Sequence, residues 1–318
     1  MIIYFVLLVF GFFVLIKGAD WMVDGASALA KKYKISDLAI GLTIVAFGTS
    51  APELVVNSVA SFKGHQDIVF GNIIGSNNFN LFIILGISGL ITPLLVQKST
   101  VKFEIPISLF AAFVLFVMTN DVLIGSGNTL SRFEGFVLLA FFCGFLYYVY
   151  SQLKTSPDEE EIEVKEMKGT KIAILIIAGL AGLVAGGKLV VDNAIQIAHT
   201  LGVSEKIIGL TIVALGTSLP ELATSAIAAF KKKADIAVGN IIGSNIFNIF
   251  LILGISSIIK PIKYTLSFNT DIAVLVAGTI FLLFALFTGV RKKLNRWQAA
   301  VLLISYIGYT IYLINNEV

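Results

Sequence analysis

Two peptides in this chain read almost alike: AFGTSAPEL at residues 46–54 and ALGTSLPEL at residues 214–222. Each places a glutamate, Glu53 or Glu221, inside a run that is otherwise apolar. A carboxylate at the centre of a bilayer costs about 3 kcal/mol even on mild insertion scales, so such a residue is a functional candidate. The proline before each glutamate removes a backbone donor and clashes with the carbonyl four residues earlier. We therefore expect each peptide to break a membrane helix and to offer the freed oxygen atoms to a cation.

Hydroxyl and amide groups accompany the glutamates at helical spacing. Thr49 and Ser50 precede Glu53 by four and three residues, so their oxygens share one face of a helix. Two further peptides, GNIIGSNNFN and GNIIGSNIFN, repeat an asparagine–serine–asparagine pattern at intervals of four: Asn72, Ser76 and Asn80, then Asn240, Ser244 and Asn248. These hard oxygen donors suit Ca²⁺ or Na⁺. The two histidines, His65 and His199, lie at span ends, where we expect them to be solvated.

The same residues also have plainer interpretations. The G-x-x-x-G spacing in GNIIG is typical of helices that pack through small residues, although packing does not explain the flanking asparagines. A buried glutamate is sometimes the partner of a lysine. Lys17 and Lys188 lie far from the glutamates along their spans, and we expect them to pair with Asp20, Asp24 or Asp192.

The composition places all these residues in a membrane protein. Of the 318 residues, 57% are apolar and only 14% are charged, and the mean hydropathy is +0.93. Soluble domains have about 25% charged residues. The net charge of +3 gives no indication of nucleic-acid binding, and the single cysteine, Cys143, permits no internal disulfide. We therefore predict an all-α polytopic membrane protein.

Runs of mainly apolar residues long enough to cross a bilayer occur ten times. They are residues 2–19, 36–61, 67–92, 103–119, 133–151, 171–190, 204–229, 235–260, 270–288 and 296–314. The loops after the odd-numbered spans carry sixteen lysines and arginines, and the loops on the other side carry five. Because positive loops stay in the cytoplasm, we expect both termini to be extracellular or periplasmic.

The second half of the chain repeats the first. GLTIVAFGTS at 41–50 matches GLTIVALGTS at 209–218, an offset of 168 residues, and 32 of 50 positions are identical over residues 41–90. We predict two five-helix units, residues 1–151 and 171–318, joined by an acidic cytoplasmic linker at 152–170. An odd number of spans turns the second unit upside down. Inverted repeats of this kind are typical of secondary transporters, whose substrate site lies where the repeats meet.

These paired motifs resemble the α-repeats of the sodium/calcium exchanger family, within the cation/calcium antiporter superfamily. The resemblance covers nearly the whole chain, and ten spans in two inverted fives is the arrangement of prokaryotic members. It implies that twelve residues bind the ions. They are Thr49, Ser50, Glu53, Ser76, Asn80 and the carbonyl of Ala46, with Thr217, Ser218, Glu221, Ser244, Asn248 and the carbonyl of Ala214.

The resemblance also implies a mechanism. The glutamates would be shared between a Ca²⁺ site and Na⁺ sites, so that the ions compete and are carried alternately. Spans 1 and 6, long and tilted in the family, would slide across the other helices as a gate. Many relatives have an aspartate where this chain has Asn248, and in the potassium-dependent branch that acid helps to hold K⁺. Its absence implies potassium independence. The large calcium-sensing domain of animal exchangers is replaced here by residues 152–170.

Three functions follow from these observations. The first is a Na⁺/Ca²⁺ antiporter of the cell membrane that works by alternating access, with Ca²⁺ and Na⁺ as substrates. The second is a H⁺/Ca²⁺ antiporter, because two intramembrane glutamates can also carry protons. The third is a passive cation channel or a sensor, which an inverted repeat within one chain disfavours. We expect no enzymatic activity, no cofactor, no nucleic acid and no obligate protein partner, and the donor set also admits Mg²⁺, Mn²⁺ or Li⁺.

Overall fold

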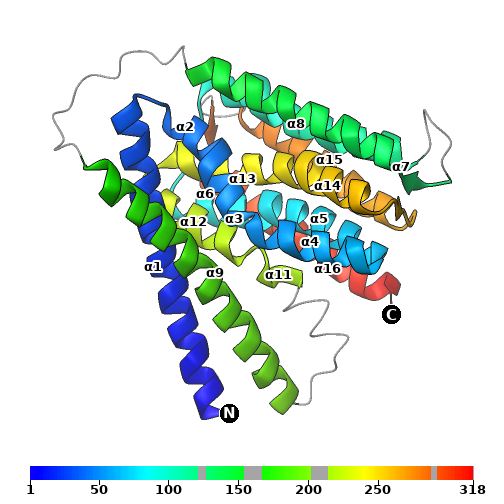
Figure 1. The fold of residues 1–318 in the computed structure, drawn as a ribbon, viewed down its shortest axis with the longest axis horizontal. Helices are drawn as coiled ribbons and strands as arrows, with labels where there is room; N and C mark the ends of the chain where they lie inside the picture. The colour runs from blue at the N-terminus through cyan, green and yellow to red at the C-terminus, as the bar shows by residue number, and fades with distance from the viewer. Residues whose placement is uncertain (121–126, 154–166, 202–213, 288–291, 318) are drawn as a thin grey trace.

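The computed structural model describes residues 1–120, 127–153, 167–201, 214–287 and 292–317, and these are almost entirely helical (Figure 1). Before the linker lie α1 (Ile2–Tyr33), α2 (Asp37–Ile40), η1 (Gly41–Val45), α3 (Ala46–Thr49), α4 (Ala51–Lys63), α5 (Gln66–Asn78), η2 (Phe79–Ile84), α6 (Leu85–Ile91), η3 (Thr100–Glu104), α7 (Ile105–Thr119) and α8 (Arg132–Leu153). After it lie α9 (Gly169–Thr200), α11 (Ala214–Gly216), α12 (Leu219–Phe230), α13 (Ala234–Ile246), η5 (Phe247–Ile252), α14 (Leu253–Ile259), α15 (Phe268–Ala285) and α16 (Arg296–Glu317). The η segments are π-helical turns within longer helices.

Seven helical stretches among the described residues are long and apolar enough to cross a membrane. They are Ile2–Tyr33, Gln66–Ile91, Thr100–Thr119, Arg132–Gln152, Gly169–Thr200, Ala234–Ile259 and Phe268–Ala285. An eighth is the bent pair Asp37–Thr49 and Ala51–Lys63, if it is one span. The protein is therefore an all-helical membrane protein. The predicted span 204–229 lies partly outside the described residues, and 296–314 coincides with α16, which is not among the seven, so ten spans stay a prediction.

The two longest helices extend beyond their predicted spans. We expected the first and sixth spans to end at residues 19 and 190, whereas α1 continues to Tyr33 and α9 to Thr200. The predicted spans end just before Asp20 and Asp192, whereas both helices continue through these residues. Asp20 pairs with Lys231 at 2.6 Å.

Helices α1 and α9 lie side by side along most of their length, as a pair that projects from the rest of the bundle (Figure 1). Their backbones touch at glycines. A Cβ atom on Gly18 would lie 2.6 Å from the backbone nitrogen of Leu183, and one on Gly179 would lie 2.7 Å from that of Met22. Small residues permit this close approach of two membrane helices. The packing therefore couples α1 to α9 as one unit.

Two short antiparallel sheets, which the sequence did not predict, join the two halves of the chain. One pairs β1 (Leu94–Leu95) with β4 (Lys293–Leu294), and the other pairs β2 (Thr129–Leu130) with β3 (Ile262–Lys263). Each strand is only two residues long, too short to leave an alternating pattern. Each sheet contains one strand from each half of the chain, so the sheets connect the two halves through the loops between helices.

Of the seven apolar stretches among the described residues, the two that carry the repeated GNIIGSN motif are the most buried. In the apolar 18-residue window of each stretch, 72% of the residues are buried in Gln66–Ile91 and 83% in Ala234–Ile259, but only 22% in α1. Figure 1 shows α5 and α13 in the middle of the bundle. Their asparagines and serines therefore lie at the centre of the protein.

Candidate cation site

Both Pro-Glu peptides break their helices, as predicted. Ser50 has φ −83° and ψ 6°, and it separates the helical stretch Asp37–Thr49 from α4, with a bend of 47° between them. Ser218 has nearly the same angles, φ −88° and ψ 5°, between α11 and α12. The proline and the glutamate then fall in the first turn of the following helix. Glu53 and Glu221 thus lie at the positive end of a helix dipole, which favours a negative charge.

The two breaks are joined by crossed hydrogen bonds. The hydroxyl of Ser50 donates to Oε1 of Glu221 at 2.9 Å, and the hydroxyl of Ser218 donates to Oε1 of Glu53 at 3.2 Å. All four side chains are buried, at 1–3% exposure. Each glutamate is therefore held by the break of the other half of the chain.

The serines and threonines also reach the helices that carry the asparagines. Ser50 Oγ lies 3.0 Å from Ser244 Oγ, and Ser218 Oγ lies 3.1 Å from Ser76 Oγ. The other contacts are made by the threonines: the hydroxyl of Thr49 donates to Asn240 Oδ1 at 2.9 Å, and that of Thr217 donates to Asn72 Oδ1 at 3.2 Å. Each of these serine and threonine contacts has its counterpart 168 residues away in the other half, so the two halves meet there with the same chemistry.

Asn80 and Asn248 are oriented by two asparagines that the sequence analysis did not select. Asn80 Nδ2 donates to Oδ1 of Asn245 at 3.0 Å, and Asn248 Nδ2 donates to Oδ1 of Asn77 at 2.9 Å. Asn77 and Asn245 also exchange amide-to-backbone bonds of 3.3 Å. Their identity in both copies of GNIIGSN was the available signal. Because the amide nitrogens of Asn80 and Asn248 donate to Asn245 and Asn77, the amide oxygens of Asn80 and Asn248 point away from those two asparagines.

Four buried oxygen atoms around this network have no hydrogen-bond partner among the described residues. They are Glu53 Oε2, Glu221 Oε2, Asn80 Oδ1 and Asn248 Oδ1. A buried polar atom without a partner costs about 1–3 kcal/mol. No ion pair among the described residues involves either glutamate. Carboxylate and amide oxygens are ligands of Ca²⁺, so this set of atoms has the chemistry to hold a cation.

The two backbone carbonyls that we expected the breaks to free, those of Ala46 and Ala214, differ from each other. The carbonyl of Ala46, which we expected to be freed by the break, accepts the N–H of Ser50 at 3.0 Å. Pro52 explains this, because its missing N–H deprives the carbonyl of Gly48 rather than that of Ala46. In the second half the N–H of Ser218 bonds instead to the carbonyl of Leu215 at 3.2 Å, and not to that of Ala214.

The remaining sequence candidates lie outside the network. His65 and His199 are exposed, as expected. Lys17 Nζ lies 3.7 Å from Asp20 Oδ2, whereas Asp24 pairs with Lys231 at 2.6 Å. Lys17 and Lys231 therefore pair with aspartates of α1 and not with the glutamates of the network.

The chain matches the family described as sodium/calcium exchanger protein over residues 3–151 and 171–315. It is 38% identical over 315 residues to CaxA of Alkalimonas amylolytica, which is provisionally named an antiporter, covering 96% of this chain and 97% of that one. It is 32% identical over 346 residues to sodium/calcium exchanger MaX1 of Methanosarcina acetivorans, covering 97% and 98%. A Ca²⁺/H⁺ antiporter, ChaA of Bacillus subtilis, is 28% identical and matches over 84% of this chain and 80% of its own.

A solved structure of the sodium-calcium exchanger NCX_Mj, soaked with Na⁺ and Sr²⁺, has the same fold. The TM-score is 0.84 at 33% sequence identity, and 98% of each chain is covered. The family match, the relatives of similar length and this shared fold agree with the paired motifs. The chain belongs to the sodium/calcium exchanger family and is a multi-pass membrane antiporter of that family.

Proposed function

We propose that this protein exchanges Na⁺ for Ca²⁺ across the cell membrane by alternating access. One observation supports this above the others: two glutamates from the two halves of the chain are buried in a network of hydroxyl and amide groups, and one oxygen of each has no hydrogen-bond partner in the described part of the chain. Two ionised glutamates balance the charge of one Ca²⁺. The surrounding hydroxyls and amides have no role in carrying protons, but they are suitable ligands for Na⁺.

Twelve residues form the proposed ion sites. They are Thr49, Ser50, Glu53, Ser76, Asn80 and Ala46 through its carbonyl, with Thr217, Ser218, Glu221, Ser244, Asn248 and Ala214 through its carbonyl. Of these, Glu53 and Glu221 are shared by Ca²⁺ and Na⁺. Sharing makes the ions compete, so that one ion leaves before the other is bound.

The two halves, residues 1–151 and 171–318, act as inverted five-helix units joined by the linker 152–170. The crossed hydrogen bonds, each with a counterpart at an offset of about 168 residues, support this symmetry. The distribution of lysine and arginine supports a cytoplasmic linker with both termini on the outer side. Helices α1 and α9 move together against the remaining helices, because their glycines hold them as one pair.

Coupling follows from the cost of burying charge. An occupied site is neutral and can pass through a closed, dry intermediate. An empty site leaves Glu53 and Glu221 charged in a low-dielectric interior, which costs several kcal/mol per ion and blocks movement without cargo. Asn248, in place of an acid, leaves no third charge for K⁺, so exchange is independent of potassium.

The alternative is exchange of H⁺ for Ca²⁺. The similarity to ChaA, which is named a Ca²⁺/H⁺ antiporter, favours testing it. Both ions neutralise carboxylates, so the glutamates alone do not distinguish the two functions.

Uptake of ⁴⁵Ca²⁺ by proteoliposomes tests the proposal. Vesicles loaded with Na⁺ are diluted into Na⁺-free buffer at equal pH, with and without K⁺, and the Glu221→Gln protein serves as the blank. We expect uptake that requires internal Na⁺ and is unchanged by K⁺. Uptake that begins only with an acidic interior would overturn Na⁺ coupling in favour of H⁺. Single-channel currents would overturn alternating access.

A further inference from the structure

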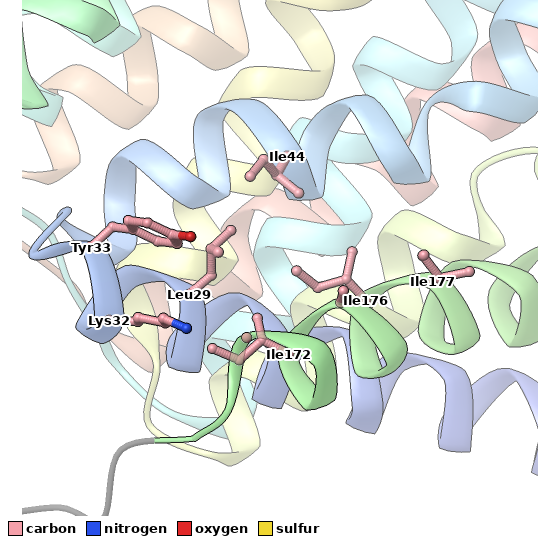
Figure 2. A pocket seen from close by; sticks show the side chains of 9 residues that line it. Leu29, Lys32, Tyr33, Ile44, Ile172, Ile176 and Ile177 are labelled. Atoms are coloured by element: carbon pink, nitrogen blue, oxygen red, sulfur yellow. The ribbon is translucent and has the colours of Figure 1, made fainter.

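An apolar groove lies between the end of α1, the start of α9 and η1, apart from the cation site. Its volume is about 350 Å³, and its walls include Leu29, Ile44, Ile172 and Ile176. Lys32 and Tyr33 stand at the end where α1 finishes, and Ile176 lies further along α9 (Figure 2). The groove thus has an apolar length and a polar, basic end.

The apolar part of the groove opens to the outer surface of the bundle. Ile177, on its rim, is 67% exposed, and Ile44 is 36% exposed. The neighbouring Ile174 of α9 is also exposed, at 65%. In a membrane protein, such side chains face lipid. The groove is therefore within reach of acyl chains along its length.

The basic end carries a concentration of positive charge. Three lysines lie where α1 ends, and two lie where α9 begins. They are Lys31, Lys32 and Lys34, with Lys168 and Lys171. All five are exposed, and none forms an ion pair with another described residue. Lys32 Nζ lies 2.7 Å from the position that a Cβ on Gly169 would take, so its ammonium group is held against the first turn of α9. That turn contains no acidic residue.

We propose that this groove binds an anionic glycerophospholipid. An acyl chain lies along Leu29, Ile176 and Ile177, and the phosphate lies at Lys32 and Lys171. The charge selects the occupant, because a zwitterionic lipid would fill the apolar walls equally well but would gain less from lysines that form no ion pair within the described part of the chain. Basic clusters beside membrane helices attract anionic lipids in this way.

The position of the groove gives the lipid a consequence for exchange. Ile44 belongs to η1, which continues directly into α3 and the break at Ser50, whereas Ile172 and Ile176 belong to the α1–α9 pair. A bound lipid would contact both parts. Under the proposed function, anionic lipid would change the exchange rate, but its binding does not depend on that function.

Native mass spectrometry of the detergent-purified full chain tests the proposal. The protein is given equal amounts of phosphatidylglycerol and phosphatidylcholine with the same acyl chains, and the bound lipids are counted. The Lys32→Gln/Lys171→Gln variant removes the basic end, and Ile176→Trp fills the apolar part. Lys63→Gln/Lys260→Gln is the matched control, because Lys260 Nζ lies 2.7 Å from the equivalent Cβ position on Gly64.

We expect phosphatidylglycerol to be retained in preference to phosphatidylcholine. The preference should fall about fivefold or more in the Lys32/Lys171 variant, since each lysine near a membrane surface contributes about that factor. The control should keep the preference, and Ile176→Trp should reduce retention of both lipids. Equal retention of the two lipids by the wild type, or an equal loss in the control, would overturn the proposal.

A photoactivatable phosphatidylglycerol provides a test that needs no variant. Crosslinks to the wild-type protein should fall on peptides containing residues 29–33 and 169–177. Crosslinks spread evenly over the exposed helices would contradict a specific site. Neither measurement involves transport, so a failure here is distinct from a failure of Na⁺/Ca²⁺ exchange.

Discussion

The hydroxyl of Ser50 donates a 2.9 Å hydrogen bond to Oε1 of Glu221, which lies 171 residues later in the chain. The reciprocal bond runs from Ser218 to Glu53. Each glutamate is thus positioned by the half of the protein to which it does not belong. A movement of one half against the other must therefore change how both carboxylates are held.

Ser50→Ala should weaken Ca²⁺ binding about tenfold or more. A hydrogen bond to a charged group contributes about 1.5–3 kcal/mol, which corresponds to that factor. Ser218→Ala should have a similar effect through Glu53. Ca²⁺ affinity measured by calorimetry in Na⁺-free buffer gives the comparison. Ser88→Ala is the control, because this serine is also buried but lies in α6 without a bond to either glutamate. Equal losses in all three variants would contradict a specific role for the crossed bonds.

Glu53→Gln and Glu221→Gln should each abolish Na⁺-dependent ⁴⁵Ca²⁺ uptake. Either change leaves one negative charge, which cannot balance a divalent ion in a buried site. The matched control is Glu104→Gln. Glu104 is equally buried, at 1% exposure, but accepts a hydrogen bond from Tyr148 away from the network.

The Glu104→Gln protein should retain uptake, provided that it elutes as a folded protein from a sizing column. Robust exchange by either Glu53→Gln or Glu221→Gln would remove the glutamates from the proposed site. Loss of exchange in all three would indicate a general intolerance of buried substitutions.

The sequence was sufficient to predict the helix breaks and most of the side chains around them. Glu53 and Pro52 stand out because a charge and a helix breaker are both costly in a membrane helix. The duplication then supported the choice of polar residues, because each one could be compared with its counterpart in the other repeat. The crossed bonds are different, because which half supports which glutamate depends on tertiary packing.

Other features left too little signal in the sequence. The sequence pattern that selected Asn80 picks residues at intervals of four. Asn77 and Asn245 do not lie at these intervals, so the pattern did not predict them. The extension of α1 past Asp20 was hidden because hydropathy counts a charge as the end of a span, whether or not a partner such as Lys231 neutralises it.

Asn248→Asp should make the protein dependent on cations for stability. The amide nitrogen of Asn248 donates to Asn77 Oδ1, and a carboxylate oxygen in its place would be an acceptor facing an acceptor. Leaving that group without a donor costs about 1–3 kcal/mol. Thermal unfolding in ion-free buffer should therefore occur at a lower temperature than in the wild type, and Ca²⁺ should restore more than the wild type gains.

Asn78→Asp is the control for this prediction. Asn78 is also buried, but its Nδ2 donates to the backbone carbonyl of Asp271, on the α15 side. The change should lower stability without a larger response to Ca²⁺. An equal response to Ca²⁺ in the two variants would argue that Asn248 does not face the ion.

Lys231→Gln should loosen the α1–α9 pair from the end of α12. Lys231 Nζ lies 2.6 Å from carboxylate oxygens of both Asp20 and Asp24 on α1. Burial alone would lower the pKa of Lys231, but its hydrogen bonds and its attraction to the two aspartates outweigh burial and raise the pKa. The lysine therefore stays charged throughout the neutral range. Partly exposed pairs contribute about 0.2–1 kcal/mol each, so we expect a shift in populations of a few-fold rather than a loss of exchange.

Spin labels at residues 33 and 230, on a Cys143→Ala background, measure this shift as a distance distribution. Both positions are exposed, and they lie at the end of α1 and the end of α12. The distribution should broaden toward longer distances in Lys231→Gln and should respond little to pH in the neutral range. Lys233→Gln is the control, because Lys233 pairs with Asp37 of α2 and not with α1. If Lys233→Gln broadens the distribution as much, the contacts of Lys231 do not specifically hold the α1–α9 pair, and the two helices are restrained by packing alone.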